Sequence, residues 1–188
     1  MPKPIKKSTK IAYTQVDVTR ITRTLYFFIG FFALSIVIFD SGNLINREAV
    51  IDRWTIATLL LIINTTVWFV ASKSIRSLQG LLVSLLSATL LAFAGFLTYW
   101  ENGMDSSSTI LFVLPLLVIA TLKNRHALLA TATLSAGTYA FATVKHFNDF
   151  FNEGYRVELW GKMLLYSAVI FTSAWLIMIL TGLRHDSK

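Results

Sequence analysis

Residues 54–100, WTIATLLLIINTTVWFVASKSIRSLQGLLVSLLSATLLAFAGFLTYW, contain two long apolar runs joined by a short basic turn. The first run ends at Ser72 and the second begins at Leu78, and Lys73 and Arg76 lie between them. An α-helix needs about 20 apolar residues to cross the hydrocarbon core of a bilayer, and each run has about that length. The stretch therefore predicts a transmembrane helical hairpin with a basic turn.

The same alternation of apolar runs and charged connections extends over the whole chain. The predicted spans are residues 24–39, 54–72, 78–100, 109–122, 127–144 and 163–182. The connections between them alternate between basic and acidic, and lysine and arginine accumulate on the cytoplasmic side of membrane helices. We therefore expect an all-α, polytopic integral membrane protein of the plasma membrane, with six transmembrane helices and both termini cytoplasmic.

The composition excludes several classes of protein. The 188 residues are 55% hydrophobic and only 14% charged, which is too apolar for an ordinary soluble domain. The net charge of +7 follows from the basic cytoplasmic face and predicts attraction to anionic lipids of the inner leaflet, and we expect no nucleic acid as a partner. The chain has no cysteine, which excludes disulfides and thiolate metal sites.

The domain organisation follows from the spans. Residues 1–23 form a basic cytoplasmic arm, residues 24–183 the six-helix transmembrane domain and residues 184–188 a cytoplasmic tail. Trp54, Trp100 and Trp160 are predicted at the outer ends of spans, and tryptophan is enriched at membrane interfaces.

Several small or polar residues within the spans predict helix packing. The candidates are Ser84, Ala88 and Ala92 in one helix, Ala132, Ala136, Gly137 and Ala140 in another, and Asn64 in a third. Small residues at four-residue spacing allow two helices to approach closely, either within one bundle or at a homodimer seam. A membrane-embedded amide such as Asn64 either bonds a neighbouring helix or contacts a ligand or ion.

The span at residues 109–122 differs from the others. It has only fourteen residues, a length at which re-entrant and buried helices also occur. Pro115 lies inside it and predicts a helix kink.

The segment 145–162 is the richest polar connection and is predicted on the outer side. It is interpreted as an amphipathic helix at the interface or as a lid over an outward pocket. A ligand would use His146, Asp149, Phe150, Glu153, Tyr155 and Glu158. The spacing of His146, Asp149 and Glu153 is also a loose metal pattern, but we predict neither a metal site nor a cofactor.

Catalytic and ion-transport signatures are missing from the sequence. No Asp, Glu, Lys or Arg falls in the middle of a span, which argues against a proton pump or a charge-lined channel. The sequence contains no Ser-His-Asp grouping, phosphate-binding glycine loop or HExxH motif. We therefore expect a protein without catalytic activity.

The stretch LPLLVIATLKNRHALLATATLSAGTYA, residues 114–140, and the direct exit of the last span into a basic tail are similar to features of a known class of sensors. With them, residues 54–183 resemble the multi-span input regions of bacterial sensor histidine kinases. This resemblance implies a sensory or signal-relaying membrane domain that works as a homodimer or with a separate signalling partner, with the last span at or near the seam. Arg184-His185-Asp186 is similar to the opening of a phosphoacceptor helix in some of these sensors. Their ATP-binding regions are not part of these 188 residues, so no phosphorylation is assigned to His185.

Two other classes remain open. Substrate-binding subunits of energy-coupling vitamin transporters also have about six spans and a basic inner face. Their alanine-rich coupling motif is usually in the first span, where this chain has only Ala33. A membrane scaffold or assembly protein would need neither a cavity nor a ligand.

Overall fold

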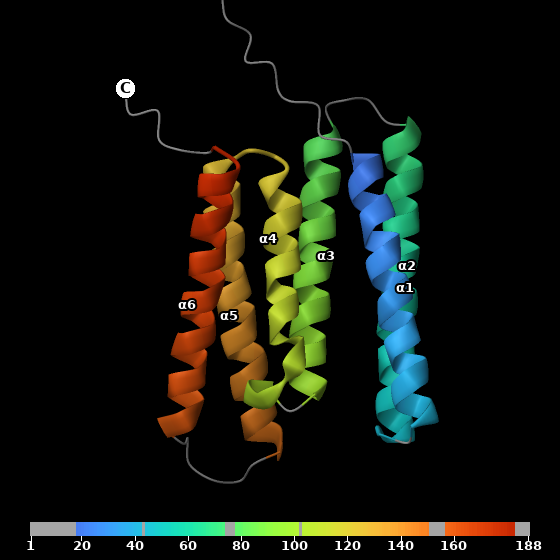
Figure 1. The fold of residues 1–188 in the computed structure, drawn as a ribbon, viewed down its shortest axis with the longest axis vertical. Coiled ribbons are helices and arrows are strands. Elements are labelled where there is room, and N and C mark those ends of the chain that lie inside the picture. Colours follow the sequence, from blue (N-terminus) through green and yellow to red (C-terminus); the bar gives the residue numbers. More distant parts are fainter. Residues whose placement is uncertain (1–17, 43, 74–77, 102, 151–156, 183–188) are drawn as a thin grey trace, which may run out of the picture.

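The computed structural model describes residues 18–42, 44–73, 78–101, 103–150 and 157–182, and the regular elements found there are all helical. The helices are α1 (Val18–Ser41), α2 (Arg47–Lys73), α3 (Gln79–Trp100), η2 (Gly103–Asp105), η3 (Ser107–Phe112), α4 (Val113–Ala120), α5 (Arg125–Phe150) and α6 (Val157–Leu180). The helices α1 to α6 run up and down along one common direction (Figure 1). The start of α1 and the end of α6 lie at the same end of the bundle (Figure 1).

Five of these helices, α1, α2, α3, α5 and α6, are long and apolar enough to cross a membrane. The remaining apolar helix, Ser107–Ala120, combines η3 and α4 and is shorter. Its fourteen residues extend over about 20–25 Å, less than the hydrocarbon core of about 30 Å. The described residues therefore hold five long candidate spans, one fewer than the sequence predicted, and this short helix lies inside the bundle beside α3 (Figure 1).

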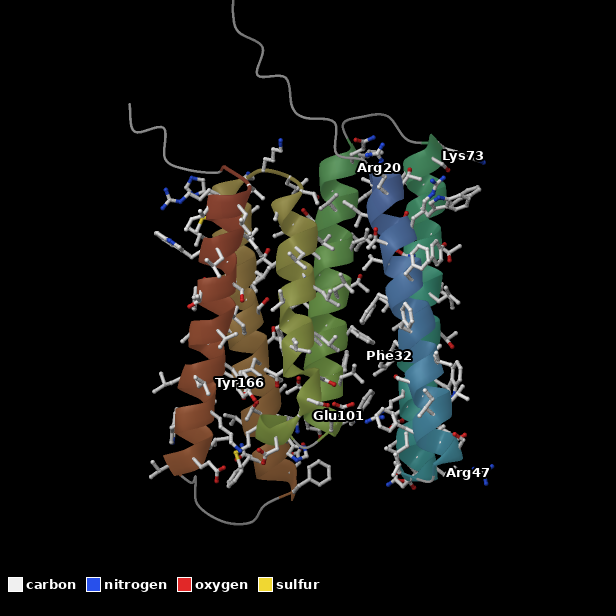
Figure 2. All side chains as sticks on the ribbon, viewed as in Figure 1. Arg20, Phe32, Arg47, Lys73, Glu101 and Tyr166 are labelled. Atoms are coloured by element: carbon white, nitrogen blue, oxygen red, sulfur yellow. The ribbon has the colours of Figure 1, made fainter. Side chains whose placement is uncertain are left out.

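The two ends of the bundle carry different charges. At one end, called the basic end, lie Arg20, Arg23, Lys73, Lys123 and Arg125. The other end, called the acidic end, holds Asp40, Glu48, Asp52, Glu101, Asp105, Asp149 and Glu158 together with Arg47, Arg53, Lys145 and Lys162. Figure 2 shows Arg20 and Lys73 at the first end and Arg47 and Glu101 at the second. This sorting of charge by end is the pattern that the positive-inside rule describes.

The bounds of α3 agree with its predicted span, whereas those of α2 differ because of a capping residue. α3 begins one residue after the predicted span and ends with it at Trp100. α2 begins seven residues before its predicted span, because the side chain of Asn46 accepts a hydrogen bond from the Ala49 amide at 2.8 Å. Asparagine is a preferred N-cap residue, so most of the connection expected between Asp40 and Arg53 is helical.

The segment 145–162 does not form a separate interfacial helix in its described part. Residues 145–150 are the last turns of α5, and residues 157–162 are the first turns of α6. The reason is that Phe147 and Leu159 are buried in the bundle, so extending α5 and α6 through these residues buries their apolar side chains. The expected interfacial helix is therefore wrong for these residues, and a lid would have to come from residues 151–156, which lie outside the described part of the chain.

The core is built around α3, which packs against α1, α2, α4 and α5. Phe28 and Phe32 of α1 meet Phe93 of α3 edge to face, with ring centroids 5.9 and 5.1 Å apart. α5 packs in turn on α4 and α6. Half of the most apolar window of α3 is buried, against 17% of that of α6, so α6 presents the widest apolar surface to its surroundings.

Candidate functional site

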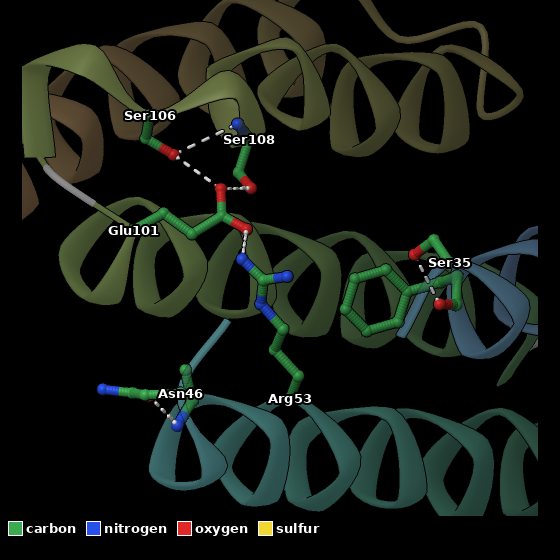
Figure 3. A network of polar contacts seen from close by, with 8 residues as sticks. Ser35, Asn46, Arg53, Glu101, Ser106 and Ser108 are labelled. Carbon is green, nitrogen blue, oxygen red and sulfur yellow. Dashed lines mark hydrogen bonds and ion pairs between the residues drawn. The ribbon is translucent and has the colours of Figure 1, made fainter. Parts of the chain in front are cut away.

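A polar network at the acidic end joins three parts of the bundle (Figure 3). The Arg53 Nη2 atom of α2 lies 2.7 Å from Oε1 of Glu101, the residue that follows α3. The other carboxylate oxygen of Glu101 accepts hydrogen bonds from the hydroxyls of Ser106, at 3.0 Å, and Ser108. Ser106 also caps η3 by accepting the Ser108 amide. One carboxylate therefore connects α2, the end of α3 and the start of the short helix.

A second polar cluster lies where α3 and α5 end together. The Tyr99 hydroxyl donates to Oδ2 of Asp149 at 2.6 Å, and the Lys145 ammonium lies 2.7 Å from the same oxygen. The His146 Nδ1 atom lies 2.6 Å from the backbone carbonyl oxygen of Tyr99. The Phe150 ring lies beside the His146 ring, with centroids 4.7 Å apart. We call Tyr99, Lys145 and Asp149 the head cluster.

An apolar groove leads from the head cluster along α3 and α5 toward the middle of the bundle. Its volume is about 470 Å³, within the ~300–1,000 Å³ range of small-molecule sites. The lining residues are Ala88, Leu91, Ala92, Gly95, Phe96 and Tyr99 of α3 and Thr138, Phe141, Ala142 and Lys145 of α5. Phe96 and Phe141 are exposed, so the groove opens sideways, toward the surroundings of the bundle.

The two helices approach closely at one point of this groove. A Cβ atom placed on Gly95 would lie 2.7 Å from the Thr138 Cγ2 atom, a separation that real Cβ contacts do not reach. Glycine at this position therefore sets the distance between α3 and α5, and with it the depth of the groove.

The predicted ligand residues separate into three groups. His146, Asp149 and Phe150 come together around Tyr99. Glu158 lies apart from them and pairs with Lys162 at 2.9 Å, and Lys162 also pairs with Asp105. Glu153 and Tyr155 lie outside the described residues. Within the described residues no group of three His, Asp or Glu side chains could hold a metal ion.

The small residues predicted for packing also separate. In α5, Ala132 is fully buried, Ala136 and Ala140 are half-buried and Gly137 is exposed. In α3, Ser84, Ala88 and Ala92 are all exposed, and the last two line the groove. The small face of α3 therefore faces outward in the single chain instead of packing against α5.

Asn64 and Pro115 both contribute to contacts between helices. Asn64 is buried, and its side-chain amide donates to the Thr22 carbonyl of α1 at 3.1 Å. Pro115 lies in the first turn of α4, just after the 3₁₀ turns of η3, and its carbonyl accepts the Ser87 hydroxyl at 3.0 Å. Proline is best tolerated in a first helical turn, where its missing N–H group is not needed.

Four buried hydroxyl groups have no hydrogen-bond partner among the described residues: those of Thr98, Ser135, Tyr139 and Thr143. The last three recur at four-residue spacing on α5, so they lie on one side of that helix. Tyr139 packs between Phe112 and Tyr166, with ring centroids 5.9 and 5.2 Å away. The side of α5 that faces the interior is therefore polar as well as close-packed.

Sequence reasoning missed the residues that organise the acidic end, namely Arg53, Tyr99, Glu101, Ser106 and Ser108. The capping pattern of Ser106 before an apolar run was the available signal. Nothing in the local sequence indicates that Tyr99 meets Asp149, because the two residues are 50 positions apart. No family model, curated protein or solved structure matches this chain.

Proposed function

We propose that this protein is a non-catalytic membrane domain that senses a condition of the bilayer and relays it to α6. The observation that carries the proposal is the arrangement of the groove, α5 and α6. A sideways opening admits a molecule from the bilayer, and the helix that forms one wall of the groove also packs on α6.

The relay would pass through adjacent residues of α5. Thr138 lines the groove, and its neighbour Tyr139 packs on Tyr166 of α6 with ring centroids 5.2 Å apart. Because packed helices shift as rigid units by about 1–2 Å, a molecule that displaces α5 would also displace α6. The described end of α6 lies at the basic end of the bundle, the end at which α1 also starts (Figure 1).

The charge distribution supports an orientation. The basic end carries no acidic side chain among the described residues, whereas the acidic end carries seven. We therefore propose that the basic end is cytoplasmic, in contact with anionic lipids of the inner leaflet, and that the protein resides in the plasma membrane.

The exposed surface of α6 supports a symmetric dimer with α6 at the seam. Leu165 and Leu176 are more than half exposed, and a relay to a second copy requires paired outgoing helices. A separate signalling partner could occupy the same surface.

Disulfide crosslinking on α6 tests this proposal. The chain contains no cysteine, so Leu165→Cys and Leu176→Cys can be examined singly in membranes. Each cysteine variant is then combined with Ala92→Phe, which fills the groove. As the matched control, each is combined with Ala130→Phe, which lies on the exposed side of α5 outside the groove. We expect dimer crosslinks whose yield changes with Ala92→Phe and not with Ala130→Phe. Equal yields in all three backgrounds would contradict the relay.

A substrate-binding subunit of a transporter is the second candidate, because the groove has the volume of a small-molecule site. This candidate predicts a monomer in which filling the groove abolishes binding and leaves α6 unchanged. The same crosslinking experiment separates it from the sensor.

A further inference from the structure

We infer that the groove between α3 and α5 holds one hydrocarbon chain of a zwitterionic phospholipid from the leaflet at the acidic end, with the lipid headgroup at the head cluster. This inference names the occupant of the groove and rests on the proposed role of the groove as the input site.

The length of the groove along α3 matches the thickness of the hydrocarbon layer of one leaflet. Ala88 lies near the middle of α3, and Tyr99 is its penultimate residue. Tyr99 is eleven positions after Ala88, which in an α-helix corresponds to a rise of about 16 Å. Half of a hydrocarbon core of about 30 Å is about 15 Å. The groove therefore extends from the midplane to one interface and stops there, as a lipid chain does.

The lining suits a flexible hydrocarbon chain. The floor is made by the small, buried residues Gly95 and Ala142, and the exposed Ala92 is also small, so these positions leave the space. Phe96 and Phe141 stand exposed at the rim. Thr138 turns its methyl group toward Gly95. A chain held here gains dispersion contacts on both flanks, which lipid packed against a convex helix surface does not obtain.

The head cluster carries one positive and one negative side chain, which complement the phosphate and the ammonium of a zwitterionic headgroup. The Lys145 ammonium contacts both carboxylate oxygens of Asp149, at 3.0 and 2.7 Å, and its third N–H donor can bond a phosphate oxygen. The Asp149 carboxylate offers a counter-charge to a headgroup ammonium. The lysine side chain is half exposed and sits at the interface level, where lysine typically places its ammonium. An anionic phosphoglycerol headgroup has no ammonium group to place against the Asp149 carboxylate.

Native mass spectrometry of the full chain tests the occupant directly. The protein is released from detergent in the presence of equal amounts of a phosphoethanolamine lipid and a phosphoglycerol lipid. We expect one phosphoethanolamine lipid to be retained per chain, and Ala92→Phe to lower retention by roughly tenfold or more, while Ala130→Phe leaves it unchanged. Lys145→Gln removes a charge-assisted hydrogen bond and is expected to lower retention about tenfold, with Lys73→Gln at the basic end as its control.

Several results would overturn the inference. Equal retention by Ala92→Phe and Ala130→Phe proteins of equal thermal stability would show that the lipid does not occupy the groove. Equal retention of the two lipids would contradict the zwitterionic headgroup. If filling the groove changes the α6 crosslinks but no lipid is retained by the unmodified protein, the lipid is refuted as the occupant and the relay stands. If a lipid is retained but filling the groove leaves the crosslinks unchanged, the relay is refuted and the lipid stands as the occupant.

Discussion

Arg53 and Glu101 form an ion pair between α2 and the end of α3, with Nη2 and Oε1 2.7 Å apart and each side chain only 15% exposed. A carboxylate at the C-terminal end of a helix is disfavoured by the helix dipole, so Glu101 depends on its partners for stabilisation. Arg53, Ser106 and Ser108 supply them. The pair thereby attaches the α1–α2 hairpin to the part of the bundle that contains the groove.

Replacing Glu101 by alanine is therefore expected to destabilise the protein. The substitution leaves the Arg53 guanidinium partly buried without its counter-charge, which costs about 3–5 kcal/mol for a buried pair. Since this pair is 15% exposed, we expect the lower part of that range. Thermal or denaturant unfolding in detergent measures the loss, and Glu48→Ala, an exposed carboxylate of α2, is the control. Equal stability of the two variants would show that the pair contributes nothing.

The close approach of α3 and α5 gives a second prediction, with a rescue. Gly95→Ala places a Cβ atom 2.7 Å from the Thr138 Cγ2 atom, and overpacking of this kind costs about 1–3 kcal/mol. Adding Thr138→Ser removes that methyl group and is expected to restore most of the stability.

Gly80→Ala on the same helix is the matched control, because nothing lies within 4 Å of the added Cβ atom. It is expected to be neutral or slightly stabilising, since alanine favours a helix over glycine by about 1 kcal/mol. A Gly95→Ala variant as stable as Gly80→Ala would mean that α3 and α5 are not held at this distance.

The membrane orientation is tested by labelling single cysteines in intact cells with a thiol reagent that does not cross membranes. Glu48→Cys at the acidic end is expected to react, and Lys73→Cys and Lys123→Cys at the basic end only after the membrane is opened. Lys123 follows the short helix, so its protection also requires η3 and α4 to carry the chain back across the bilayer. Labelling of Lys123→Cys in intact cells would show that they do not.

The sequence predicts α3 almost to the residue because opposite signals bracket it. The basic residues Lys73 and Arg76 separate the preceding apolar run from that of α3, and Trp100 marks the interfacial end of α3. The bounds of α2 and α5 were missed for a different reason. Asn46 caps α2 through a hydrogen bond that hydropathy does not register, and Phe147 extends α5 because it is buried in tertiary contacts.

The candidate site was predicted only in part, since its geometry depends on pairing between helices. His146, Asp149 and Phe150 follow from their polar and aromatic spacing, but their partner Tyr99 lies on α3 and has no local signal. Ala88 and Ala92 were recognised as a small-residue face. That they line a groove depends on how α3 and α5 cross, which residue types alone do not define.

The most direct test of the relay is the distance between the end of α6 and the end of α2 at the basic end, measured by pulsed electron paramagnetic resonance in nanodiscs. Spin labels are placed at Lys73→Cys and Leu180→Cys, both exposed, and labelled protein is diluted with unlabelled protein to remove distances between copies. We predict that Ala92→Phe shifts the distance distribution by on the order of 1–2 Å and that Ala130→Phe does not. Superimposable distributions for the unmodified protein and both variants would contradict a relay from the groove to α6.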